Sequence, residues 1–123
     1  MILIVCLDES NGMMFNNRRQ SKDCELRKRM LLLVGNNKLW MSEYSKRQFE
    51  EHYNSCNDID DADYVFVEDI KDIPSVEFEK IIVYRWNRKY PGDMFFDLGH
   101  RRLLDSTEFS GNSHDKITEE IYQ

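Results

Sequence analysis

The first candidates for chemistry in this sequence are its three histidines, His52, His100 and His114. They lie far apart and show none of the short spacings that hold a metal ion, so we expect surface or hairpin histidines and no metal site. The string Ser113-His114-Asp115 contains the residue types of a hydrolase triad. Because adjacent residues in a strand or turn rarely converge on one reacting atom, we interpret this string as part of a hairpin.

Charged side chains are unevenly distributed along the chain. Segment 18–29 holds six basic and two acidic residues, whereas segment 58–79 holds nine acidic residues against Lys71 alone. Such runs are usually solvated faces, but they can also steer a protein toward a charged partner, including a second copy in a homodimer. The acidic segment could also imitate the phosphates of nucleic acid and inhibit a basic partner.

Segment 85–90 mixes basic and aromatic residues, as single-strand binders do, but the end of a strand and its turn would look the same. The formal net charge of −6 argues against general affinity for nucleic acid or an anionic membrane.

Length and composition predict a single domain, residues 1–123, with hydrophobic residues at 41% and aromatic residues at 12%, enough for one packed core. The three cysteines are odd in number and lack CxxC spacing, which indicates free thiols. The first apolar run ends at Asp8 and is too short for a signal peptide or a membrane span. We therefore predict a cytoplasmic protein.

The hydrophobic pattern predicts an α/β domain with a mixed sheet, antiparallel at one edge. We expect strands at 2–7, 38–41, 64–67, 81–86, 102–109 and 116–122, the last two as a hairpin around 110–113. Ser21 can cap a helix that runs to about Val34, with Arg27 facing water. A capping box at Ser45 predicts a second helix that carries Phe49 and Tyr53 on one side.

Several segments, in order, resemble the dihydrofolate reductase family. The run 4–12, Ile-Val-Cys-Leu-Asp-Glu-Ser-Asn-Gly, is similar to the family's first strand and the loop after it, and 92–96, Gly-Asp-Met-Phe-Phe, to its Gly-Asp-Thr-Phe-Phe turn. The strands at 38–41 and 64–67 and the Asn-Ser-His at 112–114 also match. The resemblance implies a three-layer fold with about two main flanking helices and a strand-rich C-terminal half. It further implies that loop 8–19 overhangs the substrate cleft.

The resemblance makes Glu25 the candidate for the family's catalytic carboxylate, which lies early in the first helix. In a partly apolar pocket its pKa would be raised toward a value suited to acid work. The alternative is that Glu25 only interacts favourably with the helix dipole. Gln20-Ser21 stands where the family has Pro-Trp, so a ring that walls the pterin is missing.

The family's NADP-binding motifs are altered. Its Met-Gly-Arg-Lys-Thr becomes 41–45, Met-Ser-Glu-Tyr-Ser, and its Gly-Gly becomes Glu68-Asp69. These carboxylates repel phosphate, and segment 49–64 is shorter than the family's adenosine-binding stretch. We therefore expect no NADP binding and no other cofactor.

The leading hypothesis is a non-reductase relative of this family, a small cytoplasmic protein that binds a small molecule or a protein partner. The alternatives are an enzyme of unknown reaction with Glu25 as acid and base, or an acidic inhibitor that imitates nucleic acid. The residues expected around any remaining ligand cleft are Cys6, Asn11, Met13, Phe15, Glu25, Trp40 and Tyr84.

Overall fold

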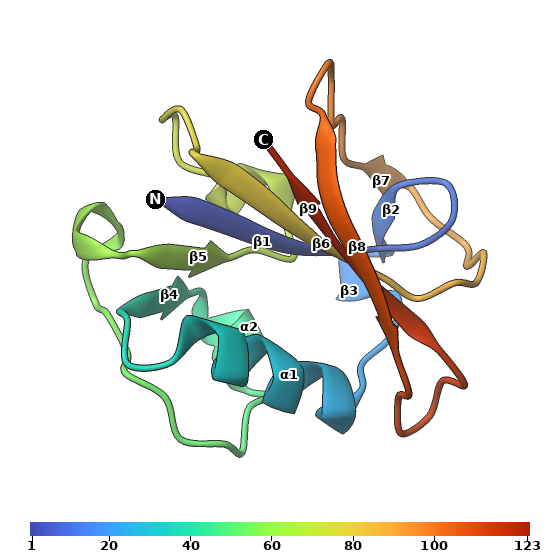
Figure 1. Ribbon diagram of the computed structural model, residues 1–123, viewed down its shortest axis with the longest axis horizontal. Helices are drawn as coiled ribbons and strands as arrows, with labels where there is room; N and C mark the ends of the chain where they lie inside the picture. The colour runs from blue at the N-terminus through green and yellow to red at the C-terminus, as the bar shows by residue number, and fades with distance from the viewer.

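The computed structural model describes all residues from Met1 to Gln123 and is built on a six-stranded mixed sheet (Figure 1). The strand order is β4-β5-β1-β6-β9-β8. The bounds are β1 Ile2–Leu7, β4 Leu39–Met41, β5 Tyr64–Phe66, β6 Lys80–Arg85, β8 Leu103–Phe109 and β9 Ile117–Tyr122. The first four strands in that order are parallel, and β9 runs antiparallel to both β6 and β8. The predicted mixed sheet and closing hairpin are confirmed.

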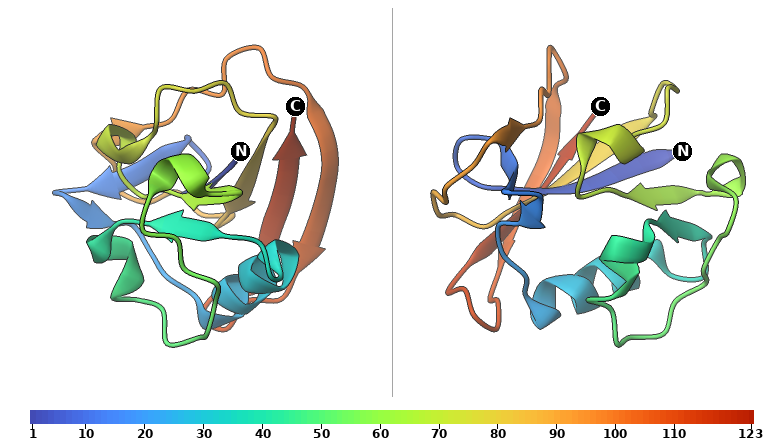
Figure 2. Two further views of the ribbon diagram at one scale, coloured as in Figure 1. Left: turned by 90° about the vertical axis from the view of Figure 1, so that its left-hand side faces the viewer. Right: turned by 180° about the vertical axis from the view of Figure 1, so that it is seen from behind.

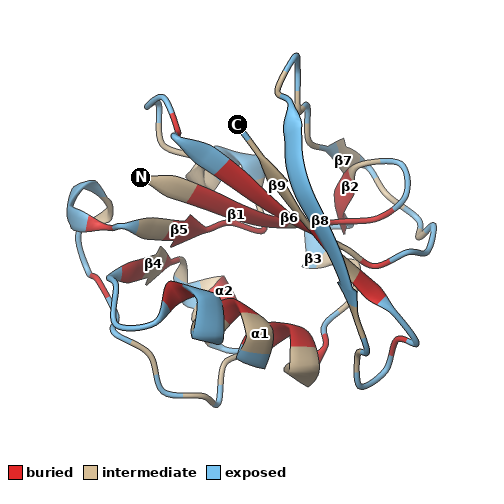
Figure 3. Cartoon of the chain, in the orientation of Figure 1, coloured by how far each residue is buried: buried red, intermediate tan, exposed pale blue.

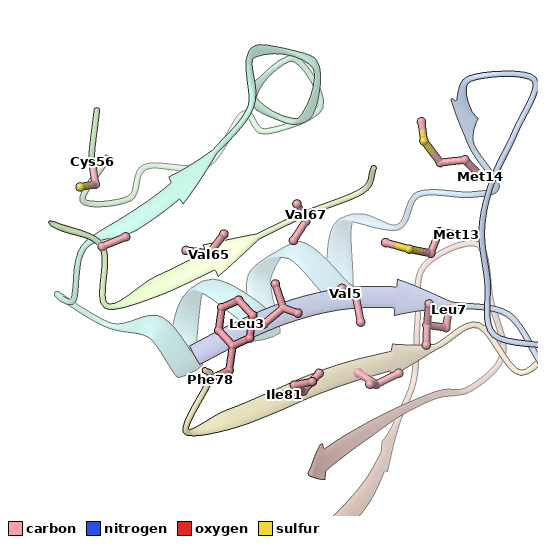
Figure 4. Packing of buried hydrophobic residues seen from close by; sticks show 12 residues of the cluster. Leu3, Val5, Leu7, Met13, Met14, Cys56, Val65, Val67, Phe78 and Ile81 are labelled. Carbon is pink, nitrogen blue, oxygen red and sulfur yellow. The ribbon is translucent and has the colours of Figure 1, made fainter. Parts of the chain in front are cut away.

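β1 lies inside the sheet because nearly every side chain in it is apolar. Leu3, Val5 and Leu7 face one hydrophobic cluster and Ile4 faces the other, each with no more than 1% of its surface exposed. Figure 4 shows the first cluster, where Met13 packs against these strands from β2, Gly12–Phe15, a strand outside the six-stranded sheet. A strand buried on both faces is what the continuous apolar run predicts.

Helix α1, Cys24–Val34, lies across the face of the sheet opposite to this first cluster (Figures 1 and 2). Leu26, Met30 and Val34 are its buried apolar positions. The prediction that Ser21 caps the helix is wrong. Asp23 is the cap, because its Oδ1 accepts hydrogen bonds from the amides of the first turn, and the hydroxyl of Ser21 is bound elsewhere.

A second helix is present as predicted, but its predicted position, starting at a capping box at Ser45 and carrying Phe49 and Tyr53, is wrong. Helix α2, Glu43–Lys46, is a single turn capped by Ser42, and the chain after it is irregular. Phe49 and Tyr53 still lie side by side, with ring centroids 5.8 Å apart, but in an irregular segment that packs against the second cluster. Two 3₁₀ turns, η1 Ile59–Asp61 and η2 Ile70–Asp72, complete the connections.

The predicted loop 8–19 forms part of a second, three-stranded sheet of order β3-β2-β7. Its strands are β2 Gly12–Phe15, β3 Arg18–Arg19 and β7 Met94–Phe95. Gly12 begins β2, where its amide donates to Asp8 Oδ1 at 2.7 Å and an added Cβ would lie 2.5 Å from Gln20 Nε2, so the Gln20 side chain would have to shift. Because β2 pairs with β7, the loop is tied to the 90–96 segment.

The edge strand β8 is the most exposed part of the sheet. β8 is an edge strand whose residues are almost all exposed, whereas β1 and β6 are buried (Figure 3). No helix of the structure has both the length and the apolar character needed to cross a membrane.

Candidate functional site

The space between α1 and the sheet, where a ligand cleft was expected, is almost filled by side chains. The remaining cavity measures about 10 Å³, which is at the lower limit for one water molecule. Its walls are Cys6, Ser21, Asp23, Leu26, Arg27, Met30, Gln48, Phe49, Phe66, Glu68 and Trp86. We call this space the inner cavity; it has no room for a small-molecule ligand.

A buried ion pair closes one side of the inner cavity. Glu68, just after β5, accepts hydrogen bonds from Arg19 Nε at 2.8 Å and Nη2 at 3.1 Å. It also accepts from Ser45 Oγ at 2.8 Å and from Gln48 Nε2 at 3.0 Å. The Arg19 guanidinium stacks over the Tyr44 ring at 4.2 Å. The carboxylate is fully satisfied, which is the condition under which a buried charge is tolerated.

Arg27 forms another wall, and the expectation that it faces water is wrong. The residue is 9% exposed, and its Nε donates to Glu51 Oε1 at 2.8 Å. The irregular segment that replaces the predicted second helix supplies Glu51, and its Phe49 also lines the inner cavity. Arg27 is buried because this segment lies against the side of α1 that carries it.

Glu25, the predicted acid, does not line the inner cavity. Its side chain is 45% exposed, and its carboxylate accepts from Lys28 Nζ at 3.2 Å. The position is that of a first-turn acid on the outer surface of α1. The structure thus places no catalytic carboxylate from Glu25 beside the sheet.

The other predicted ligand residues are dispersed. Cys6 does line the inner cavity, and its thiol has a raised pKa, first because of burial and then because of the negative charge of Glu68. Tyr84, paired with Cys6 on the neighbouring strand β6, is buried, and its hydroxyl donates to Glu119 at 2.8 Å. Met13 and Trp40 pack in the hydrophobic cluster on the other face of the sheet. The side chain of Asn11 accepts a hydrogen bond from Arg85. Phe15 is 41% exposed and lines a separate cavity. The structure does not bring the seven residues together.

Sequence reasoning missed a buried polar network centred on Asp23 and His114. Asp23 Oδ2 binds His114 Nδ1 at 2.9 Å and accepts from the amides of Asn112 and Ser113, each at 2.9 Å. Burial acts to raise the pKa of Asp23, but these hydrogen bonds outweigh it and leave that pKa well below its ordinary value. Asp23 is therefore ionised at neutral pH. Asp115, the acidic residue that directly follows His114 in the sequence, is exposed.

The other imidazole nitrogen of His114 meets two hydroxyl groups. Ser21 Oγ and Tyr90 Oη each lie 3.0 Å from Nε2. The ring is stacked on Trp86 with centroids 4.7 Å apart, and its side chain is 3% exposed. Four side chains from two distant parts of the chain, Ser21 and Asp23 in one and Trp86 and Tyr90 in the other, thus hold one histidine. The sequence did contain two relevant signals, an Asp at a helix start and the Asn-Ser-His turn. Nothing in their positions along the sequence indicates that they meet in the fold.

Two larger cavities lie outside the filled cleft. One, of about 470 Å³, has Tyr90, Gln20, Phe15 and Arg18 in its walls; we call it the outer cavity. The other, of about 360 Å³, contains Glu43, Glu68, Asp69 and Asp72 and one cation, Lys71, whose Nζ lies 3.7 Å from Asp69 Oδ2; we call it the acidic cavity.

In the acidic cavity the pKa of Asp72 is raised, first by burial and then by the charge of Asp69. No cluster of three or more histidine, cysteine or acidic side chains has a geometry suited to a metal ion.

No known sequence family matches this chain, and neither does any curated protein. Solved structures do match. The fold is similar to that of a dihydrofolate reductase from Enterococcus faecalis complexed with NADP(H) and RAB-propyl, with a TM-score of 0.64 and 9% sequence identity. The match covers 99% of this chain and 94% of that chain. At this identity the likeness concerns the fold alone, and it confirms the predicted dihydrofolate reductase-like α/β fold.

Proposed function

We propose that this chain is a non-reductase relative of dihydrofolate reductase, a small binding protein that has the fold without the NADP-dependent reaction. The observation that carries the proposal is the inner cavity of about 10 Å³ between α1 and the sheet. A pterin could enter there only if several buried side chains moved out. Binding by this chain would therefore use its outer surfaces.

The charges around the filled cleft also support the proposal. Glu68 and Asp69 follow β5, where the family resemblance requires Gly-Gly, and Glu43 follows Ser42 at the start of α2. A phosphate at close range to one such carboxylate is repelled by about 1–4 kcal/mol, depending on the local dielectric. The Arg19 guanidinium, the nearest cation in this network, is already occupied by Glu68.

The arrangement on α1 supports the loss of the folate reaction. Glu25 is 45% exposed, while α1 contributes Leu26, Arg27 and Met30 to the wall of the inner cavity, and the charged one among them is the cation Arg27. A guanidinium keeps its proton at every physiological pH, so it cannot protonate a bound pterin. The acidic residue at the helix cap, Asp23, does line the inner cavity, but its carboxylate has a lowered pKa and is bound by His114 and by backbone amides, so it is not a proton donor at neutral pH.

The proposal is tested by measuring NADPH oxidation in the presence of dihydrofolate, with the Enterococcus faecalis enzyme as the positive control. We expect no rate above the protein-free background, and no shift of the melting temperature with NADPH and folate together. Turnover of dihydrofolate would refute the proposal. A cooperative thermal melt of the same sample shows that the chain used was folded.

A second candidate function is the binding of a basic protein segment at the acidic cavity. Burial raises the pKa of Asp72 most, and the negative charge of Asp69 raises it further; a bound cation would offset that repulsion. The partner is a different protein or segment 18–29 of a second copy. Fluorescence anisotropy of a labelled oligolysine peptide tests it. We expect binding that weakens with salt and is lost in Asp69→Asn/Asp72→Asn, and binding that is insensitive to both changes would rule this function out.

A further inference from the structure

We propose that Ser21, His114 and Asp23 form an ester-hydrolysing site in which Ser21 is the nucleophile. The proposal goes beyond the loss of reductase chemistry and does not depend on it. Ser21 Oγ lies 3.0 Å from His114 Nε2, and His114 Nδ1 lies 2.9 Å from Asp23 Oδ2. Nucleophile, base and orienting carboxylate are thus joined by two hydrogen bonds in the order that acyl transfer requires.

The tautomer of the imidazole follows from its hydrogen-bond partners. Asp23 is ionised and binds at Nδ1, so that nitrogen carries the hydrogen and Nε2 presents its lone pair to Ser21. Stacking on Trp86 and almost complete burial hold the ring in this orientation. His114 is therefore set to accept a proton from a hydroxyl group and from nothing else nearby.

Tyr90 supplies the group that an oxyanion needs. Nε2 has one lone pair and two hydroxyl neighbours, so when Ser21 donates to it the hydrogen of Tyr90 is free to point elsewhere. Tyr90 also forms part of the wall of the outer cavity. Its hydroxyl can donate to a carbonyl oxygen bound there and stabilise the negative charge that develops on it.

The outer cavity is large enough for a small ester. It measures about 470 Å³, and Tyr90, whose hydroxyl contacts the same His114 Nε2 as Ser21 Oγ, forms part of its wall; Ser21 itself is half-buried and lines the inner cavity, so an ester must reach it from the Tyr90 side. Phe15 and Pro91 offer an apolar surface to an acyl or aryl group. Arg18 is exposed there and has no ion-pair partner, so we expect the site to favour a short-chain aryl ester that carries a negative charge.

The reaction needs only water as its second reactant. Ser21 Oγ attacks the carbonyl carbon as its proton moves to His114 Nε2, and the carbon–oxygen bond to the leaving group then breaks as Nε2 returns that proton to the leaving oxygen. The product is an acyl ester of Ser21 and a free alcohol or phenol. Water then attacks the acyl group by the same steps and releases the carboxylic acid, with Ser21 restored.

The test is labelling of the full chain with a fluorophosphonate, which reacts with activated serines, followed by peptide mass spectrometry. We expect one adduct, on Ser21, and hydrolysis of 4-acetoxybenzoate that Ser21→Ala reduces to background. Ser106→Ala, on the exposed edge strand β8, is the matched control and should retain both reactions. Absence of an adduct on Ser21, under conditions that label a known serine esterase, overturns the proposal, as does unchanged hydrolysis in Ser21→Ala.

Two further variants separate chemistry from folding. Tyr90→Phe keeps the nucleophile and should lower kcat at least tenfold by removal of the oxyanion donor. Asp23→Asn, a change to a positioning residue, should lower kcat with little effect on KM, since it disturbs the tautomer of His114 and not the outer cavity. If both variants are folded and both keep the full kcat, the assignment of roles is wrong.

Discussion

The carboxylate of Asp23 binds the imidazole of His114 at 2.9 Å across a separation of 91 residues. Through this contact the first turn of α1 is joined to the turn between β8 and β9, because Asp23 also accepts from the amides of both elements. The helix that covers the sheet and the hairpin that closes it therefore share one buried charge.

The first prediction concerns the acid sensitivity of this contact. The folded-state pKa of Asp23 is depressed below the unfolded value of about 3.9, so its stabilising contribution is fully present above that pH and is lost as the pH falls below it. Asp23→Asn should cost about 1–3 kcal/mol at pH 7, and the difference from wild type should shrink toward pH 3. Urea unfolding at several pH values measures this. Exposed Asp115→Asn serves as control, and parallel acid profiles for wild type and Asp23→Asn would contradict it.

Gly111 should not tolerate a side chain, because it lies against the same network. A Cβ at this position would stand 2.7 Å from Asp23 Oδ2 and 2.7 Å from the backbone oxygen of His114. We expect Gly111→Ala to lower the free energy of unfolding by about 1–3 kcal/mol, since the turn must move away from Asp23. Urea unfolding checks this against Ser110→Ala, an exposed neighbour that should change stability by less than about 0.5 kcal/mol. Equal stabilities of the two variants would show that the turn adjusts freely.

The strands were predictable because their signals are local. The run 2–7 is apolar throughout and forms β1 with the same bounds, and the hairpin of β8 and β9 follows from two strand-like runs around a polar turn. The cap of α1 was not predictable, because Ser21 and Asp23 are equally good capping residues. The choice between them is made by His114, which binds both side chains from the other end of the chain.

The candidate site was harder to predict for the same reason. The sequence showed that Glu68 is an unsuitable residue beside a phosphate, but not that Arg19, 49 residues away, would pair with it and close the cleft. The helical pattern predicted that Arg27 faces solvent. It is buried because the irregular segment around Glu51 packs against it. Long-range pairing of charges leaves no period in the sequence.

The Arg19–Glu68 pair should contribute more to stability than any surface pair. Glu68→Gln leaves the guanidinium without its partner in a mostly buried place, and we expect a loss of about 3 kcal/mol, near the lower end for broken buried pairs because Arg19 keeps 20% of its side chain exposed. Glu43→Gln breaks the exposed pair with Lys46 and should cost less than about 1 kcal/mol. Urea unfolding of both variants at one pH makes the comparison. Similar losses would mean that Glu68 is tolerated in the cleft and does not stabilise it.

The three free cysteines should differ strongly in their reaction with a disulfide reagent such as DTNB. Burial, and then the charge of Glu68, raise the pKa of Cys6, and Cys56 is buried, with its thiol donating to the Asp58 carbonyl at 2.9 Å. Cys6 and Cys24 are both partly exposed, but the raised pKa of Cys6 leaves little reactive thiolate there, so we expect one fast-reacting thiol, Cys24, in the folded chain and three in urea. Cys24→Ser should remove the fast phase and Cys6→Ala should retain it. A second fast thiol in the native protein would show that the inner cavity opens readily to solvent.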